Sequence, residues 1–73
     1  MKTLDQLEIG EMMKVKNIEK GSAVRRKLLD MGITPGIEIN VTGKAPFGDP
    51  VEIMVRGYKL TLRKNEAKSV SGE

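Results

Sequence analysis

The chain has 73 residues, and its 13 Lys or Arg against 10 Asp or Glu leave a net charge of +3. This length suits one small domain, and we expect residues 1–73 to form it. The absence of Cys and His excludes disulfides, thiolate or imidazole metal sites and the common nucleophile–base pairs. We therefore expect no enzymatic activity and no resident cofactor. With one Tyr, one Phe and no Trp to stack bases, we also expect no nucleic-acid partner.

The sequence also lacks the signals of membrane insertion and of secretion. No run approaches the roughly 18 apolar residues of a membrane-spanning helix. Residues 1–7 do not contain the apolar stretch of a signal peptide. Both observations favour a cytoplasmic protein that is not itself inserted in a membrane.

The N-terminal part of the chain predicts one helical turn followed by one strand. Thr3 can cap a turn over residues 3–7. Residues 11–19 alternate between apolar and polar side chains until Ile18, which breaks the period of two. A bulge near residues 16 and 17 would return Ile18 to the core.

Residues 22–31 predict the single clear helix. Ser22 is a natural cap at its start, and Gly32 stands where a left-handed residue ends a helix. An apolar stripe at helical spacing is formed by Val24, Leu28, Leu29 and Met31. The basic residues 25–27 fall mostly outside this stripe. A solvated face is their ordinary interpretation, and a contact surface is the alternative.

The rest of the chain predicts β structure. Pro35 and Gly36 suit the central positions of a type II turn, and Gly57 suits a tight reversal between two strands. The alternating segments predict strands at 37–42, 51–56 and 58–63, and weaker signals predict a turn at 64–67 and a strand at 69–71.

These elements describe a mainly β domain of five short strands and one inserted helix. An open sheet of this size would leave long edges unpaired and one apolar face wet, whereas a closed barrel covers that face. We therefore predict a small five-stranded SH3-like barrel with one short inserted α-helix at about residues 22–31. An OB-type barrel has a similar strand count and is the alternative.

The connection 43–50 is the most informative loop, because it carries two of the three prolines and the only Phe. Phe47 is interpreted either as a contact residue beside a groove or as a plug at the end of the barrel. Asp49 and Glu52 are a nearby carboxylate pair. Because Asp49 belongs to turn dipeptides, we expect it to bond backbone amides rather than to take part in catalysis.

Five methionines are many for a chain of this length. Met13 and Met31 fall on apolar faces, where core packing explains them. Met12 and Met54 fall opposite the inward faces of their strands. Exposed thioethers at these two positions suit an adaptable protein contact better than a metal site.

Two strings of the sequence resemble the signature of a known family. RRKLLDMGITPG at residues 25–36 is similar to the RRxLLDMGxTPG signature of the FeoA family. APFGDPV at residues 45–51 is similar to the APFGDP loop of that family. Gly57, Leu60 and the segment 62–67 resemble its closing part, so the match covers essentially the whole chain in order and spacing.

The resemblance implies a small cytoplasmic protein with an SH3-like fold that accompanies FeoB. FeoB is a membrane ferrous-iron transporter with a cytoplasmic GTP-binding domain, and we expect a FeoB-type transporter to be the partner, engaged by protein–protein docking. The predicted contact residues are Arg25, Arg26, Pro46, Phe47, Asp49, Met12 and Met54. The predicted turn residues are Gly32, Pro35, Gly36 and Gly57.

Two other functions fit the same sequence. Transition-metal binding is also attributed to the family, so a carrier or sensor that binds the metal directly and weakly is one alternative. The net positive charge, with Lys and Arg along the last hairpin, makes a basic nucleic-acid-binding barrel the other alternative.

Overall fold

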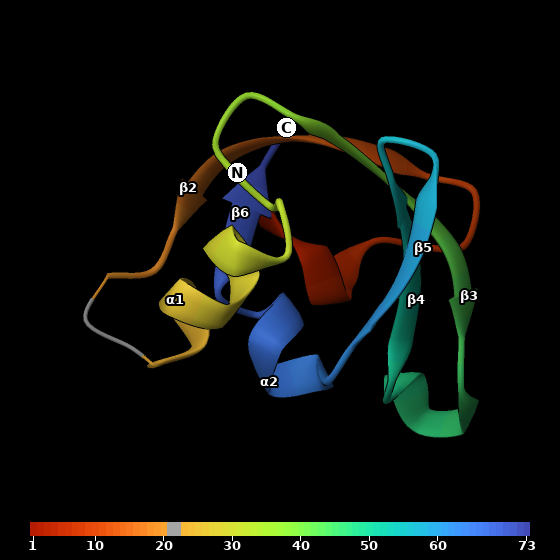
Figure 1. Ribbon diagram of the computed structural model, residues 1–73. Coiled ribbons are helices and arrows are strands. Elements are labelled where there is room, and N and C mark those ends of the chain that lie inside the picture. The colour runs from red at the N-terminus through yellow and green to blue at the C-terminus, as the bar shows by residue number, and fades with distance from the viewer. Residues whose placement is uncertain (21–22) are drawn as a thin grey trace.

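The computed structural model describes residues 1–20 and 23–73, and in these residues one antiparallel sheet forms the body of the domain. Its strand order is β1-β6-β2-β3-β4-β5 (Figure 1). The strands are β1 Lys2–Thr3, β2 Met12–Ile18, β3 Glu38–Lys44, β4 Val51–Val55, β5 Tyr58–Leu62 and β6 Val70–Gly72. They are connected by the helices α1 Ala23–Asp30 and α2 Lys64–Ala67 and the 3-10 turns η1 Leu4–Gln6 and η2 Pro46–Gly48.

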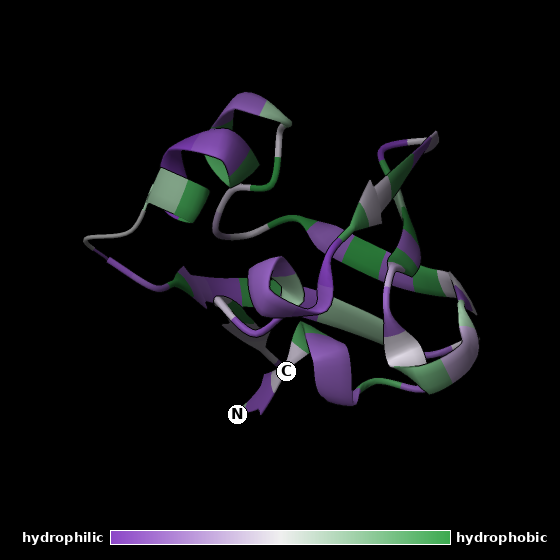
Figure 2. Cartoon of the chain, turned by 90° about the horizontal axis from the view of Figure 1, so that it is seen from below, coloured by the Kyte–Doolittle hydropathy of each residue, from purple (hydrophilic) through white to green (hydrophobic). Residues whose placement is uncertain are grey.

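The core of the described residues is built by alternation along the strands. In β4, every second residue is buried. Figure 2 shows hydrophobic residues in green beside hydrophilic residues in purple along the strands of the sheet. In β2, Met13 and Val15 are buried, and the register with β6 shifts between Val15 and Asn17. This shift is the predicted bulge, and it leaves Ile18 fully buried.

The sheet has one strand more than predicted. β1 pairs with β6 through Lys2 opposite Gly72 and Thr3 opposite Ser71. A strand of two residues is too short to carry an alternating pattern, so the sequence offered no signal for it. The remaining strands lie within two residues of their predicted bounds, and the predicted turn at 64–67 is the short helix α2.

The helix α1 ends through its own backbone. The Gly32 N–H donates to the Leu29 carbonyl at 3.0 Å, and the Ile33 N–H donates to the Leu28 carbonyl at 3.0 Å. This is the Schellman arrangement, and Gly32 takes the left-handed φ of +91° that it requires. Leu28 and Ile33 are both fully buried, so the helix end is fixed to the core.

Two further points concern the start and the length of α1. The predicted cap Ser22 lies outside the described residues. Helix α1 has eight residues, and no helix in the described part of the chain is long and apolar enough to cross a membrane.

Two tight turns follow the predicted positions. The Ile37 N–H donates to the Thr34 carbonyl at 3.3 Å, which closes the turn through Pro35 and Gly36. Between β4 and β5 the turn consists of Arg56 and Gly57, whose φ angles are +51° and +84°. Two consecutive left-handed residues form the type I′ turn that matches the twist of a hairpin.

Gly72 is the most crowded position of the sheet. It lies in β6 between β1 and β2, opposite Lys2 on one side and Val15 on the other. A Cβ atom added to Gly72 would stand 2.1 Å from the carbonyl oxygen of Lys14 and 2.9 Å from Cγ of Met13. The strands therefore approach one another here at a distance that only glycine permits.

Candidate functional site

The segment 45–50, called the Phe47 loop below, joins β3 to β4 and presents its aromatic side chain to solvent. Phe47 is 97% exposed, so the interpretation as a barrel plug is wrong. Its φ of +67° lies in the left-handed region, which is costly for a bulky residue. The phenyl ring therefore contributes little to the packing of the domain, although its backbone is held in a costly conformation.

The loop is held by hydrogen bonds at its base. The Ala45 N–H donates to the Pro50 carbonyl at 3.0 Å, and the Gly48 N–H donates to the Ala45 carbonyl at 2.8 Å. From outside the loop, the Lys44 ammonium donates to the Asp5 carbonyl of η1 at 3.2 Å. Phe47 therefore stands on a braced support, which lowers the ordering cost of using it in binding.

Asp49 is one of these braces. Its Oδ1 accepts the Lys64 backbone N–H at 3.1 Å and lies 3.9 Å from a guanidinium nitrogen of Arg63. The carboxylate thus ties the Phe47 loop to the start of α2. Glu52 instead accepts the Thr42 hydroxyl at 3.0 Å, so the two carboxylates engage different partners.

The basic residues of α1 differ in their surroundings. The Arg25 guanidinium donates to the Ile18 carbonyl at the end of β2 at 2.7 Å, which gives this side chain a place within the fold. Arg26 is exposed, and its Nε lies 3.9 Å from an Asp30 carboxylate oxygen one turn later. Of these two predicted contact residues, Arg26 is therefore the one that faces solvent.

Lys27 forms an ion pair that the sequence reasoning missed. Its Nζ donates to Oε2 of Glu66 in α2 at 2.6 Å, while Oε1 of Glu66 accepts the Arg63 backbone N–H at 2.8 Å. The Lys27 hydrogen bond, with the Arg63 amide assisting it, lowers the pKa of the Glu66 carboxyl against the opposing effect of burial. The spacing of Arg63 and Glu66 is that of a helix N-cap and its third residue, which accounts for the bond to the Arg63 amide but gave no signal for Lys27.

The predicted contact elements do not form one surface. Figures 1 and 2 both place α1 and η2 at opposite sides of the molecule, with α2 between them. The ties of Asp49 to Lys64 and of Lys27 to Glu66 both end on α2. Helix α2 therefore lies between α1 and the Phe47 loop and is bonded to both, so these two elements do not contact a partner as one continuous surface.

The two predicted contact methionines lie in one row across the outer face of the sheet. Met12 of β2 stands opposite Asn40 of β3, and Asn40 stands opposite Met54 of β4. Met12 is 54% exposed and Met54 is half-buried. Asn40 separates them, so the row is a mixed surface rather than a continuous apolar patch.

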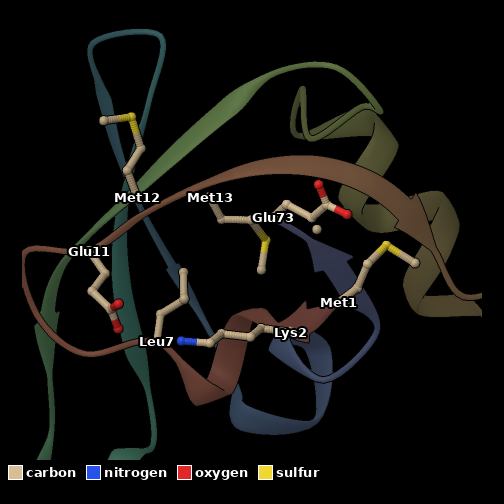
Figure 3. Close-up of a pocket in the computed structure, with 8 residues that line it drawn as sticks. Met1, Lys2, Leu7, Glu11, Met12, Met13 and Glu73 are labelled. Carbon is tan, nitrogen blue, oxygen red and sulfur yellow. The ribbon is translucent and has the colours of Figure 1, made fainter.

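A surface cavity of about 460 Å³ lies beside the chain termini and contains three methionines (Figure 3). In Figure 3 the Met12 side chain points away from Met13 and Glu73, so the sulfur atoms do not converge. No three carboxylates gather as metal ligands in residues 1–20 and 23–73. The cavity is lined by Met1, Lys2, Leu7, Glu11, Met12, Met13, Gly72 and Glu73.

Several solved structures with the same architecture are FeoA proteins. A FeoA-like protein from Clostridium acetobutylicum is 51% identical, with a TM-score of 0.92, over 97% of this chain and 83% of that chain. A FeoA from Stenotrophomonas maltophilia is 27% identical, with a TM-score of 0.87, over 100% of this chain and 91% of that chain. The latter is described as an SH3 domain protein complexed with zinc, which confirms the SH3-like prediction over the OB-type alternative.

A fusion of Fe(2+) transport protein A with the Fe(2+) transporter FeoB from Porphyromonas gingivalis is 30% identical over 70 residues. The match covers 96% of this chain and 8% of that protein. The FeoA domain itself is matched over residues 2–73. These matches link the chain to ferrous iron transport, and with the shared architecture they show that it belongs to the FeoA family.

Proposed function

We propose that this chain is a cytoplasmic accessory protein of ferrous iron uptake that docks onto a FeoB-type transporter through the Phe47 loop. The Porphyromonas gingivalis relative supports the pairing, because it carries both parts in one polypeptide. Docking of this kind needs a complementary surface rather than a reactive group.

The observation that carries the proposal is the state of Phe47. Full exposure forgoes the roughly 1.5–3 kcal/mol that burial of a large apolar side chain contributes. The left-handed backbone costs about 1–2 kcal/mol more. A partner that covers the ring recovers the free energy of burying it. The hydrogen bonds at the base of the loop already order the ring, so little further ordering is needed on binding.

Capture of the transporter by the immobilised chain tests the proposal. Full-length FeoB in detergent and its separate GTP-binding domain are both offered, each with GDP and with a non-hydrolysable GTP analogue. We expect Phe47→Ala to lose capture by at least tenfold, the order of magnitude of an interface hot spot. Ile9→Ala is the matched control, because Ile9 is also exposed and apolar but lies outside the loop. It should retain capture.

A second variant asks whether α1 adds a contact of its own. Arg26→Glu reverses the exposed charge without disturbing the bond between Arg25 and Ile18. If α1 contacts the transporter, Arg26→Glu weakens capture independently of Phe47→Ala. No capture of either FeoB preparation by a wild-type chain with a folded NMR spectrum would refute the docking function.

A further inference from the structure

Strand β5 forms an edge of the sheet that is suited to pairing with another chain. It stands last in the strand order and pairs with β4 alone. Its register with β4 runs without a shift from Tyr58 to Leu62, and the strand contains no proline. The opposite edge, β1, has only two residues. Bulges, prolines, charged side chains and very short strands are the usual protection of an edge. Of these, β5 has one charged side chain, that of Lys59, and it is five residues long.

The turn between β4 and β5 determines which backbone groups face outward. A two-residue turn closes on a hydrogen-bonded pair, here Val55 with Tyr58. Alternation then turns the N–H and C=O of Lys59 and Thr61 away from β4. In the described residues, no backbone hydrogen bond outside the β4–β5 ladder uses these groups. They are donors and acceptors that an added strand can satisfy.

A groove runs beside this edge. It has a volume of about 340 Å³ and lies between the residues that end α1 and strand β5. Tyr58 is 74% exposed and Leu60 is half-buried, so apolar surface adjoins the unpaired backbone. The residues that form the groove around them include Met31, Gly32, Arg56 and Lys59.

The charges of the groove select its occupant. Its charged residues are Arg56 and Lys59, both cations, and the carboxylate of Glu52 lies 3.8 Å from the Lys59 ammonium. A second copy of the chain paired through β5 would bring these cations against one another, which is unfavourable. An extended segment with carboxylates would instead meet opposite charge.

We infer that the β5 edge binds an extended acidic segment of another protein as an additional strand, with its apolar side chains in the groove beside Tyr58 and Leu60. Backbone hydrogen bonds to Lys59 and Thr61 supply affinity, and the groove and cations supply selectivity. The inference does not rest on the transporter as partner. The Phe47 loop precedes β4, whereas the turn that begins the β5 edge follows it.

The test uses the full chain labelled with ¹⁵N and a synthetic peptide in which Glu and Val alternate. We expect the largest NMR shifts at the amides of Lys59 and Thr61, together with slower hydrogen exchange at both. A peptide in which Lys replaces Glu should bind at least tenfold more weakly, because it faces Arg56 and Lys59 with like charge.

Two substitutions in β5 distinguish binding by strand addition from binding by charge attraction alone. Thr61→Pro removes an outward N–H at a position where an edge strand tolerates proline, and Thr61→Val retains it. Loss of one such hydrogen bond corresponds to about a tenfold loss of affinity. Thr61→Pro should show this loss and Thr61→Val should not. If Thr61→Pro fails to fold, N-methylation of alternate amides in the peptide tests the same pairing, because it removes the hydrogen bonds that the peptide N–H groups donate to β5.

Three outcomes would overturn the inference. The first is that no peptide shifts the β5 amides at millimolar concentration. The second is that the affinity stays unchanged after N-methylation of one alternate set of peptide amides and also after N-methylation of the other set. The third is that the free chain pairs with itself through β5, so that the amides of Lys59 and Thr61 are already protected. None of them bears on capture of FeoB by the Phe47 loop, so the two proposals fail separately.

Discussion

Substitution of Gly72 by Ala tests the close approach of β6 to β2. The new Cβ would lie 2.1 Å from the Lys14 carbonyl oxygen and 2.9 Å from the Lys14 carbonyl carbon, so backbone has to move. The same carbonyl accepts the Glu73 N–H at 3.1 Å, and the Lys14 N–H donates to the Glu73 carbonyl at 2.9 Å. Relief of the clash therefore separates the strands at a point where two hydrogen bonds join them.

The size of the effect follows from these contacts. Two weakened hydrogen bonds cost about 1–3 kcal/mol. Overpacking costs about 1–3 kcal/mol, and because both terms describe one displacement we expect a total of about 2–4 kcal/mol. A domain of 73 residues has a stability of roughly 4–11 kcal/mol, so Gly72→Ala removes a large part of it. Its melting temperature should fall by about 10–30 °C.

Urea unfolding and thermal unfolding, both followed by circular dichroism, measure this loss. Gly43→Ala is the matched control, because Gly43 is also a strand glycine and its added Cβ would meet Cβ of Glu52 at an ordinary 3.5 Å. We expect that control to stay within about 1 kcal/mol of the wild type. A Gly72→Ala variant as stable as Gly43→Ala would refute the reasoning from close approach.

Four further variants address the loop and the ion pair. Phe47→Asn should raise the free energy of unfolding by about 0.5–1 kcal/mol while transporter capture falls, because Asn accepts a left-handed backbone better than Phe; unfolding and capture are measured on the same sample. Asp49→Ala should cost about 1 kcal/mol by freeing the Lys64 N–H, and Asp49→Asn, which keeps an acceptor, should cost less in the same urea titration. The lowered pKa of Glu66 means that its contribution to stability is complete above the ordinary carboxyl pKa and is lost as pH falls through the folded-state pKa. Glu66→Gln should therefore flatten the fall in melting temperature between about pH 5 and pH 2, and an unchanged acid limb would contradict the assignment.

The strands and helix were predictable because each carries a periodic apolar pattern. The alternation in β4 identified its buried residues, and the break at Ile18 identified the bulge in β2. What the pattern could not supply was pairing over long distances in the sequence. β1 has two residues and exists because β6 is beside it. The contact between Lys27 and Glu66 likewise depends on where α1 and α2 meet.

The candidate site was predictable in its residues but not in its arrangement. The composition of the loop singled out Phe47, yet burial and exposure of a lone Phe were equally consistent with the sequence. Asp49 was expected to bond backbone amides, and the amide it accepts belongs to Lys64 in a different element. Arg25 and Arg26 are adjacent in the sequence, but a helix turns successive residues to different surroundings, which left only Arg26 facing solvent.

The pairing of β2 divides the sheet into two parts, which we expect to form at different rates. Residues 12–14 of β2 pair with β3, whereas residues 15–18 pair with β6, near the other end of the chain. The meander β3-β4-β5 closes over short loops, so we expect it to form early. The β1-β6-β2 pairing closes nearly the whole chain and should form last and open first. A domain of this topology completes its folding only when β6 is available to pair with β1 and β2. Changes at residues 70–72 should therefore decide whether the barrel closes.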